Sequence, residues 1–403
     1  MPSPTAPNFP FDDALKGVEV LLDPERMRHR VQEGFGVHGR LARLRIRSFE
    51  YVPHVSLRVH YTAEVGTLRH DLSAQIGFPV PAQKEIERLT TSAKDRRVAR
   101  LPVARMGDLA AHVSWYPVDF GLPLLSESDV EIADLVGLDS AGPTTQIEWM
   151  PGRYAVIRYP NAVVRVYNEP ADATRSVYAL RLIDGHLPVA RLTTKNEERG
   201  LVAQELRQGK PLQPDKAVAA GSTVGSFISQ LHKADTGTFD PKGQLVHLDR
   251  AALLVAAQTT GELVGFCVPE LKERVDAVLA ILGSSPAEQV PTVASHGSLT
   301  YGNIYQHGDS LHVPDADHLC FASRAYDLAT FAVSTVSGRA EDHETLNTVV
   351  QALAEGYGSN VEAMNWHLAA AIITSLDRPL NGLARDWTER TGNLLTIAEK
   401  LTA

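Results

Sequence analysis

The chain has 403 residues, more than the roughly 250 to 300 that one compact core usually holds, so at least two domains are expected. Hydrophobic residues make up 44% and charged residues 22% of the chain, which are ordinary globular values and exclude a disordered or fibrous protein. The formal net charge is -9, and no dense basic stripe occurs, which argues against a nucleic-acid partner.

The N-terminal residues 1–17 are rich in proline and lack both a basic segment and an apolar run, so we expect a disordered leader there. No stretch of about 18 apolar residues free of charge occurs, which predicts no membrane partner and a cytoplasmic location. The two cysteines, Cys267 and Cys320, stand among apolar neighbours and are expected to be buried free thiols.

A hairpin is predicted over residues 49–61, within a region, 18–145, that we expect to fold as an N-terminal α+β extension. Apolar and polar residues alternate there on both sides of Pro53, which is a turn former. The same pattern returns over residues 147–159 around Pro151. It predicts two related hairpins and an extension related to the following lobe, unless two amphipathic hairpins are similar by chance.

Strand patterns continue through residues 162–167 and 200–206, and a helix is predicted between them over 171–183. They predict a small sheet with one helix packed on it, within a small lobe and hinge over 146–212. Beyond residue 213 the apolar residues recur at helical spacing, which predicts a helical lobe over 213–403. The clearest helical patterns cover residues 218–233, 250–259 and 268–282.

Residues suited to chemistry gather between positions 293 and 329, in short segments rich in His, Gly, Asn and Asp. These segments read SHGSLTYGNIY from Ser295, LHVPDAD from Leu311 and RAYDLA from Arg324. They resemble the aminoglycoside phosphotransferase and choline kinase-like family, whose catalytic loop reads His-Gly-Asp with an Asn further on. Similar pieces at 208–212, 231–232, 356–357 and 366–367 extend the resemblance over about residues 147–400.

The resemblance implies the α+β class and a bilobal protein-kinase-like fold, with a small β-rich lobe, a larger helical lobe and a catalytic-loop region at 293–329. It also implies ATP, or another nucleoside triphosphate, and Mg²⁺ as cofactors. Asn303 and Asp315 match the family's metal ligands, and Asp317 adds a further carboxylate. His296 and Asp327 match residues that hold the catalytic loop. The alternative is that Asn303 and Asp315 are simple turn residues.

The chain departs from the family at its catalytic positions. Ser298 stands where the family has its base aspartate, and a hydroxyl near neutral pH does not accept a proton as a carboxylate does. Arg165 replaces the phosphate-binding lysine, and Ser176 stands where a helix glutamate holds that lysine. The ion pair that positions this cation is therefore missing unless Glu169 substitutes. Glu205 is the second residue expected to bind the nucleotide. The His-Gly-Asp at 307–309 lacks an Asn at the right spacing and is predicted to be a hairpin turn.

The segment Met150–Arg153 is the turn between the first two strands of the small lobe, and it contains one glycine where kinases have a Gly-rich phosphate loop. Members of this family often lack such a loop, so its absence decides little. The altered catalytic positions, set against the retained Asn303 and Asp315, leave two functions open. The first is phosphoryl transfer to a hydroxyl of a small molecule or of a peptide Ser/Thr. The second is a pseudokinase-type protein that binds nucleotide, peptide or a partner enzyme without transfer. Similar extensions in actinobacterial phosphotransferase-like proteins imply, by analogy alone, a role in modifying ribosomally made peptides.

Overall fold

The computed structural model describes residues 12–35, 41–79, 82–93, 103–139, 142–234, 236–285, 292–359, 361, 363–381 and 386–403. The chain divides into two compact units. The first comprises Met1–Thr174, Thr193–Gln204 and Asn381–Arg385, and the second Arg175–Leu192, Glu205–Leu380 and Asp386–Ala403. Residues 1–11 of the expected leader lie outside the described residues.

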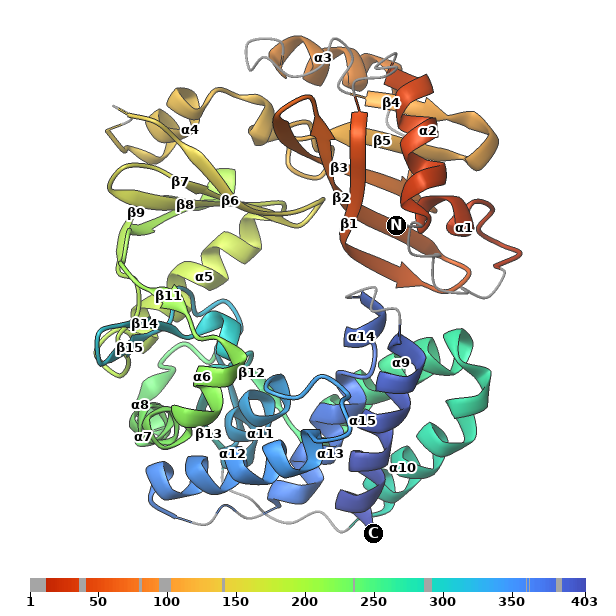
Figure 1. Cartoon of the computed structure of the whole chain (residues 1–403). Coiled ribbons are helices and arrows are strands. Elements are labelled where there is room, and N and C mark those ends of the chain that lie inside the picture. The colour runs from red at the N-terminus through yellow and green to blue at the C-terminus, as the bar shows by residue number, and fades with distance from the viewer. Residues whose placement is uncertain are drawn as a thin grey trace. The chain divides into compact units, whose positions relative to one another are not determined.

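The first unit contains two five-stranded sheets with the same strand order (Figure 1). The N-terminal sheet has the order β1-β2-β3-β5-β4 and the second sheet the order β6-β7-β8-β10-β9. The strands of the N-terminal sheet are β1 (Leu41–Val52), β2 (Ser56–Val65), β3 (Leu68–Ile76), β4 (Val103–Met106) and β5 (Ala111–Trp115). Those of the second sheet are β6 (Thr145–Met150), β7 (Tyr154–Arg158), β8 (Ala162–Tyr167), β9 (Leu192–Asn196) and β10 (Leu201–Glu205).

The helices around the two sheets also recur in the same order. Each sheet has a helix between its third and fourth strands and a 3₁₀ turn between its fourth and fifth. These are α3 (Gln83–Ala93) and η2 (Gly107–Leu109) in the first case, and α5 (Pro170–Ile183) and η4 (Glu197–Arg199) in the second. The remaining elements of this part of the chain are α1 (Val18–Leu21), α2 (Pro24–Phe35), η3 (Pro123–Ser126) and α4 (Asp129–Val136).

Both hairpins predicted from the sequence are confirmed. β1 pairs with β2 across a turn in which His54 has a φ of 62°, and β6 pairs with β7 across a turn in which Gly152 has a φ of 70°. Ala110 and Gly200, which follow the two 3₁₀ turns, also share a left-handed conformation, with φ of 49° and 69°. The N-terminal sheet is thus a structural repeat of the second.

The second sheet and α4 enclose a hydrophobic core. Trp149, Ile157 and Val164 from the sheet pack with Ile132 and Val136 from the helix, and each is at most 2% exposed. Alternate residues of the strands supply this core, because successive side chains of a strand point to opposite faces of the sheet.

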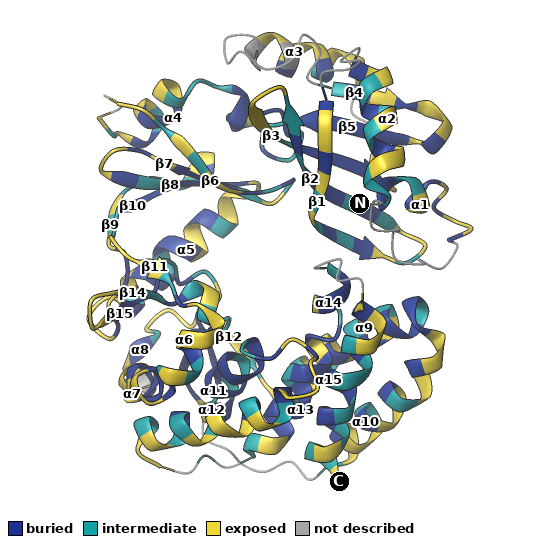
Figure 2. Ribbon diagram, in the orientation of Figure 1, coloured by how far each residue is buried: buried dark blue, intermediate teal, exposed yellow. Residues whose placement is uncertain are grey.

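The second unit is mostly helical and carries two three-stranded sheets, of order β11-β14-β15 and β12-β16-β13. Its strands are β11 (Lys210–Pro211), β12 (Val246–Leu248), β13 (Thr292–Ser295), β14 (Tyr305–His307), β15 (Ser310–His312) and β16 (Cys320–Ser323). Its helices are α6 (Pro214–Ala219), α7 (Gly221–His232), α8 (Thr236–Phe239), α9 (Arg250–Cys267), η5 (Pro269–Leu271), α10 (Lys272–Ser284), η6 (Tyr301–Asn303), α11 (Arg324–Ser334), α12 (Asp342–Tyr357), α13 (Met364–Thr374), α14 (Arg378–Asn381) and α15 (Trp387–Thr402). Figure 2 shows α11 and α13 buried over most of their surface.

The helix predicted over residues 250–259 continues to Cys267 as α9. The part of α9 beyond residue 259 contains Gly261 and Gly265, and glycine weakens an isolated helix. A Cβ atom at Gly261 would lie 2.9 Å from Val275 Cγ1, and one at Gly265 would lie 3.2 Å from Lys272 Cγ. The two glycines therefore let α9 pack closely on α10, and this packing compensates for their low helix propensity. None of the helices in the described part of the chain is both long enough and apolar enough to span a membrane.

Candidate active site

The loop after β13 is held by Asp327, which lies in the first turn of α11. Asp327 is 1% exposed. One of its carboxylate oxygens accepts a hydrogen bond from the His296 backbone N–H at 2.7 Å, and the other accepts one from the Gly297 N–H at 3.0 Å. The phenol of Tyr326 donates to the Gly297 carbonyl oxygen at 3.0 Å. Hydrogen bonds to two N–H groups and to one carbonyl oxygen thus fix the backbone of residues 296 and 297.

A histidine at the end of α7 supports Asp327 in turn. His232 Nε2 lies 3.5 Å from Asp327 Oδ2, and its Nδ1 lies 3.0 Å from the Tyr357 hydroxyl. Burial opposes the ionisation of Asp327, but His232, His296 and the Gly297 N–H together hold the pKa of this carboxyl below its usual value. The carboxylate is therefore ionised at neutral pH. His232 and Tyr357 belong to two of the segments that carry the family resemblance, and the structure brings them together here.

The segment with the predicted metal ligands lies next to this loop. His296 Nε2 is 3.1 Å from the backbone carbonyl oxygen of Asp315. Asp315 and Asp317 are both half-buried and flank Ala316, which is fully buried. Ser176 of α5 donates its hydroxyl to Asp317 Oδ1 at 2.7 Å and is itself 1% exposed. Sequence reasoning singled out Ser176 only as a replaced glutamate and missed this contact.

Asn303 closes the 3₁₀ turn η6. Its amide oxygen accepts hydrogen bonds from the Thr300 N–H at 2.7 Å and the Thr300 hydroxyl at 3.2 Å, and its amide N–H donates to the Ser298 carbonyl oxygen at 2.6 Å. Both lone pairs of the Asn303 oxygen are thereby used within the turn. Asn303 must leave this arrangement to bind a metal ion, whereas the carboxylates of Asp315 and Asp317 are oxygen donors of the kind that Mg²⁺ takes.

Ser298 is half-buried on the same loop, and its carbonyl oxygen is the one that Asn303 binds. The His-Gly-Asp at 307–309 forms the turn between β14 and β15, in which His307 pairs with Ser310 and Gly308 has a φ of 60°. The prediction that this segment is a hairpin turn is confirmed.

The two residues expected to bind nucleotide lie in different units, Arg165 in the first and Glu205 in the second. Arg165 is 9% exposed and lies on the face of β8 opposite to Val164 and Val166, which belong to the core. Glu205 ends β10 and pairs with Arg207. Burial disfavours its charged form, but bonds from the Arg207 side chain and the Arg191 backbone hold the pKa of Glu205 below its usual value.

Among the residues that the structure describes, one group of three metal-binding side chains lies close enough to share an ion, and it lies elsewhere, at Asp12, Asp13 and His54. Asp12 accepts hydrogen bonds from the Tyr51 hydroxyl at 2.7 Å and the His54 N–H at 2.9 Å. Burial opposes its ionisation, but these bonds and those from two further backbone N–H groups lower the pKa of Asp12 to about 2. Asp12 thus fastens the β1–β2 turn, and its oxygens are already used.

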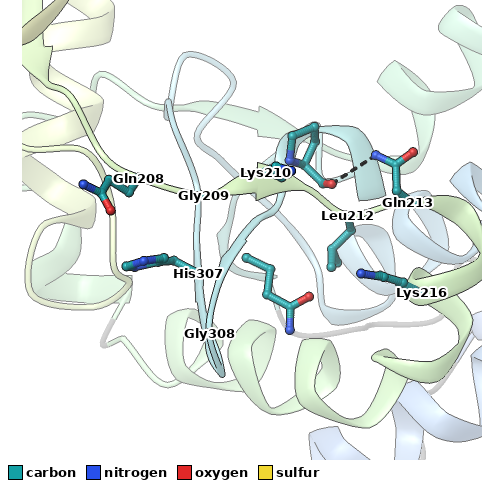
Figure 3. A pocket seen from close by; sticks show the side chains of 10 residues that line it. Gln208, Gly209, Lys210, Leu212, Gln213, Lys216, His307 and Gly308 are labelled. Atoms are coloured by element: carbon teal, nitrogen blue, oxygen red, sulfur yellow. Dashed lines mark hydrogen bonds between the residues drawn. The ribbon is translucent and has the colours of Figure 1, made fainter. Parts of the chain in front are cut away.

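A groove of about 630 Å³ lies beside β11, α6 and the β14–β15 turn (Figure 3). Lys210 and Lys216 line it together with the amide side chains of Gln208, Gln213 and Gln306. None of the described residues that line it carries a negative charge. We expect a small molecule held in this groove to carry hydrogen-bond acceptors or negative charge.

Comparison with known proteins agrees with the family resemblance of the sequence. Residues 148–367, more than half of the chain, match the model of the phosphotransferase enzyme family (APH). No curated protein matches the chain.

Solved structures are also similar to this chain. A GDP complex of an aminoglycoside 2'-phosphotransferase-IIIa variant matches with a TM-score of 0.51 and 14% identity, over 67% of this chain and 96% of that one. A choline/ethanolamine kinase family protein from Mesorhizobium loti gives 0.47 and 14%, over 68% and 94%. A macrolide 2'-phosphotransferase from Brachybacterium faecium gives 0.45 and 23%, over 67% and 95%. The first similarity shows the fold, and the expected α+β protein-kinase-like fold is confirmed.

Proposed function

Because this chain belongs to the phosphotransferase enzyme family, we propose that it transfers the γ-phosphoryl group of ATP, or of another nucleoside triphosphate, to a hydroxyl group of a small molecule or of a peptide Ser/Thr. The observation that carries the proposal is the loop at 296–297, which the ionised Asp327 holds by two backbone hydrogen bonds beside the segment that bears Asp315. Phosphoryl transfer depends mostly on positioning and electrostatics, and a braced loop supplies the positioning.

Each residue has a role that its chemistry allows. Asp315 and Asp317 would hold Mg²⁺, which neutralises charge on the phosphates. Ser176 fixes the orientation of Asp317 through the 2.7 Å hydrogen bond. Arg165 supplies a positive charge for the phosphates, and its guanidinium stays charged even when buried.

Ser298 favours a second candidate, a pseudokinase-type protein that binds nucleotide, peptide or a partner enzyme without transfer. A hydroxyl at the position of the base cannot accept the proton of the attacking group near neutral pH. Under this candidate the acceptor is replaced by a bound peptide or protein, including one from ribosomal-peptide modification. Nucleotide binding is common to both candidates, so transfer must be measured separately.

Calorimetric titration of the full chain with ATP and Mg²⁺ tests the part that the candidates share. We expect Mg²⁺-dependent binding in the wild type and its loss in Asp315→Ala. The matched control is Asp309→Ala, because Asp309 is an exposed carboxylate in the β14–β15 turn and has no place in the proposed site. Equal binding by Asp315→Ala and the wild type would assign Asp315 to a turn and reject the metal role.

Transfer from radiolabelled ATP to small hydroxyl compounds and Ser/Thr peptides separates the candidates. In a weak kinase, Ser298→Asp restores a base, and general-base catalysis is typically worth about 10² to 10⁴ in rate. Ser298→Asn is the control, since it adds similar bulk without a base. No transfer by any of the three proteins would favour the pseudokinase candidate.

A further inference from the structure

The turn between β6 and β7 is bound by the N-terminal extension. Asp119, in the segment between β5 and η3, accepts a hydrogen bond from the Gly152 N–H at 2.7 Å and one from Trp149 Nε1 at 2.8 Å, both on the same carboxylate oxygen. Its other oxygen accepts the Gly121 N–H at 2.8 Å. Asp119 is 1% exposed. All four residues belong to the first unit, and Figure 1 shows the tip of this hairpin reaching β1 and β2.

Two further contacts hold the same turn. Glu50 of β1 forms an ion pair with Arg153 at 3.0 Å and also accepts a hydrogen bond from Arg58 at 3.3 Å. A Cβ atom at Gly121 would lie 2.6 Å from the Gly152 Cα, so the two backbones touch and residue 121 must be glycine. The turn is therefore anchored by a buried carboxylate, an ion pair and a close backbone contact.

This turn has the chain position of the phosphate-covering loop of kinases, between the first two strands of the small lobe. Such a loop acts on phosphates through its free backbone N–H groups and its freedom to move. Here the Gly152 N–H already donates to a buried carboxylate, and an unmade hydrogen bond to that carboxylate would be costly. The backbone of the turn can therefore act on a nucleotide only through a fixed shape.

We propose that Asp119 is a positioning residue, through which the N-terminal extension sets the β6–β7 turn in the one arrangement that accommodates the phosphates of the bound nucleotide. The extension is then an integral part of the nucleotide-binding lobe. This inference rests on the proposed function, since it assumes that the chain binds a nucleoside triphosphate.

The test compares ATP with adenosine, which lacks the phosphates. In the full chain, Asp119→Asn keeps an acceptor for Gly152 but places an amide N–H against the Gly121 N–H. We expect about tenfold weaker ATP binding and unchanged adenosine binding. Glu50→Gln, which removes the ion pairs of Glu50 with Arg153 and with Arg58, is a milder variant that is expected to fold and to change ATP binding in the same direction. Asp108→Asn is the control, because Asp108 accepts a 2.6 Å hydrogen bond from Arg30 within the N-terminal extension and has no contact with the anchor of the turn.

Equal losses for ATP and adenosine would reduce Asp119 to a structural role and overturn the proposal, as would unchanged or tighter ATP binding in both turn variants. Hydrogen exchange at the Gly152 amide tests the anchor without a nucleotide, and so separates failure of this inference from failure of the proposed function. The amide should be protected in the wild type and should exchange at least about tenfold faster in Asp119→Asn. A wild type that binds neither ligand would reject the proposed function, and an unprotected Gly152 amide would reject the anchor itself.

Discussion

The N-terminal sheet and the second sheet share their strand order, a left-handed residue in two of their turns and the position of their helix, but they differ in their side chains. In the second sheet, Arg165 of β8 pairs opposite Val156 of β7, whereas in the N-terminal sheet Gln75 of β3 pairs opposite Arg58 of β2. The cation expected to bind phosphates is therefore present in one sheet, and an uncharged amide takes its place in the other. The comparison teaches that one strand order can present different side chains at the position expected to bind phosphates. Under our proposal the first sheet supports the second through Asp119 and Glu50.

The largest expected effect concerns His112, which pairs opposite Gln75, while the corresponding position in the second sheet is the buried Val202. Burial, with the charges of Arg58 and Arg105, lowers the pKa of His112 to about 4. The unfolded chain binds a proton at this residue near pH 6.5, so its contribution to the free energy of unfolding is complete above that pH and falls as the pH drops toward 4.

We expect a loss on the order of 3 kcal/mol from His112 across this range, and His112→Val should not show it. Urea unfolding of both proteins at pH 7.5 and pH 4.5 measures the difference. The same pH dependence in the variant and the wild type would mean that His112 is not the group that titrates.

A smaller effect is expected when the second sheet is given the residue of the first. Arg165→Gln removes the charge and should weaken ATP binding about 10- to 100-fold, since a hydrogen bond to a charged group contributes about 1.5 to 3 kcal/mol. The reciprocal Gln75→Arg should not create a second nucleotide site. Calorimetric titration of both variants with ATP measures these affinities. Unchanged ATP affinity in Arg165→Gln would show that the two sheets do not differ in the way that we describe.

The smallest effect concerns Ala110 and Gly200, which occupy the same left-handed position after the 3₁₀ turns. Gly200→Ala places a Cβ 2.7 Å from the Tyr167 carbonyl oxygen and should destabilise the chain by about 1 to 2 kcal/mol. Ala110→Gly relieves strain but adds chain entropy, so it should change stability by less than about 1 kcal/mol. Thermal unfolding of both variants checks the asymmetry, and a larger loss from Ala110→Gly would contradict it.

Local features of the fold could be read from the sequence. The alternation around Pro53 and Pro151 predicts both hairpins, and the apolar face of Val224, Phe227 and Ile228 predicts α7, because these signals lie within one element. The length of α9 could not be predicted in this way, since Gly261 weakens a helix in isolation and is tolerated only where Val275 packs against it. The common strand order of the two sheets also depends on pairing between distant segments.

In the candidate site, too, the sequence predicts local features but not contacts between distant residues. The motifs at 295–305 and 324–329 led to His296 and Asp327, which the structure places in direct contact. The contact of Ser176 with Asp317 joins residues 141 positions apart and leaves no periodic pattern in the sequence. Nor does the type of residue at 303 show that its amide oxygen is turned toward Thr300. The metal and nucleotide roles of these residues stay predictions.

The two cysteines have a practical consequence for experiments on this protein. Cys267 and Cys320 are both buried, and burial raises the pKa of Cys267 to about 12 and that of Cys320 further still. Thiol reagents act on the thiolate, so neither cysteine should be labelled in the folded chain. A single exposed thiol from Asp309→Cys would then carry a fluorophore or spin label on the β14–β15 turn, beside the groove that Lys210 lines, with no background from the native cysteines.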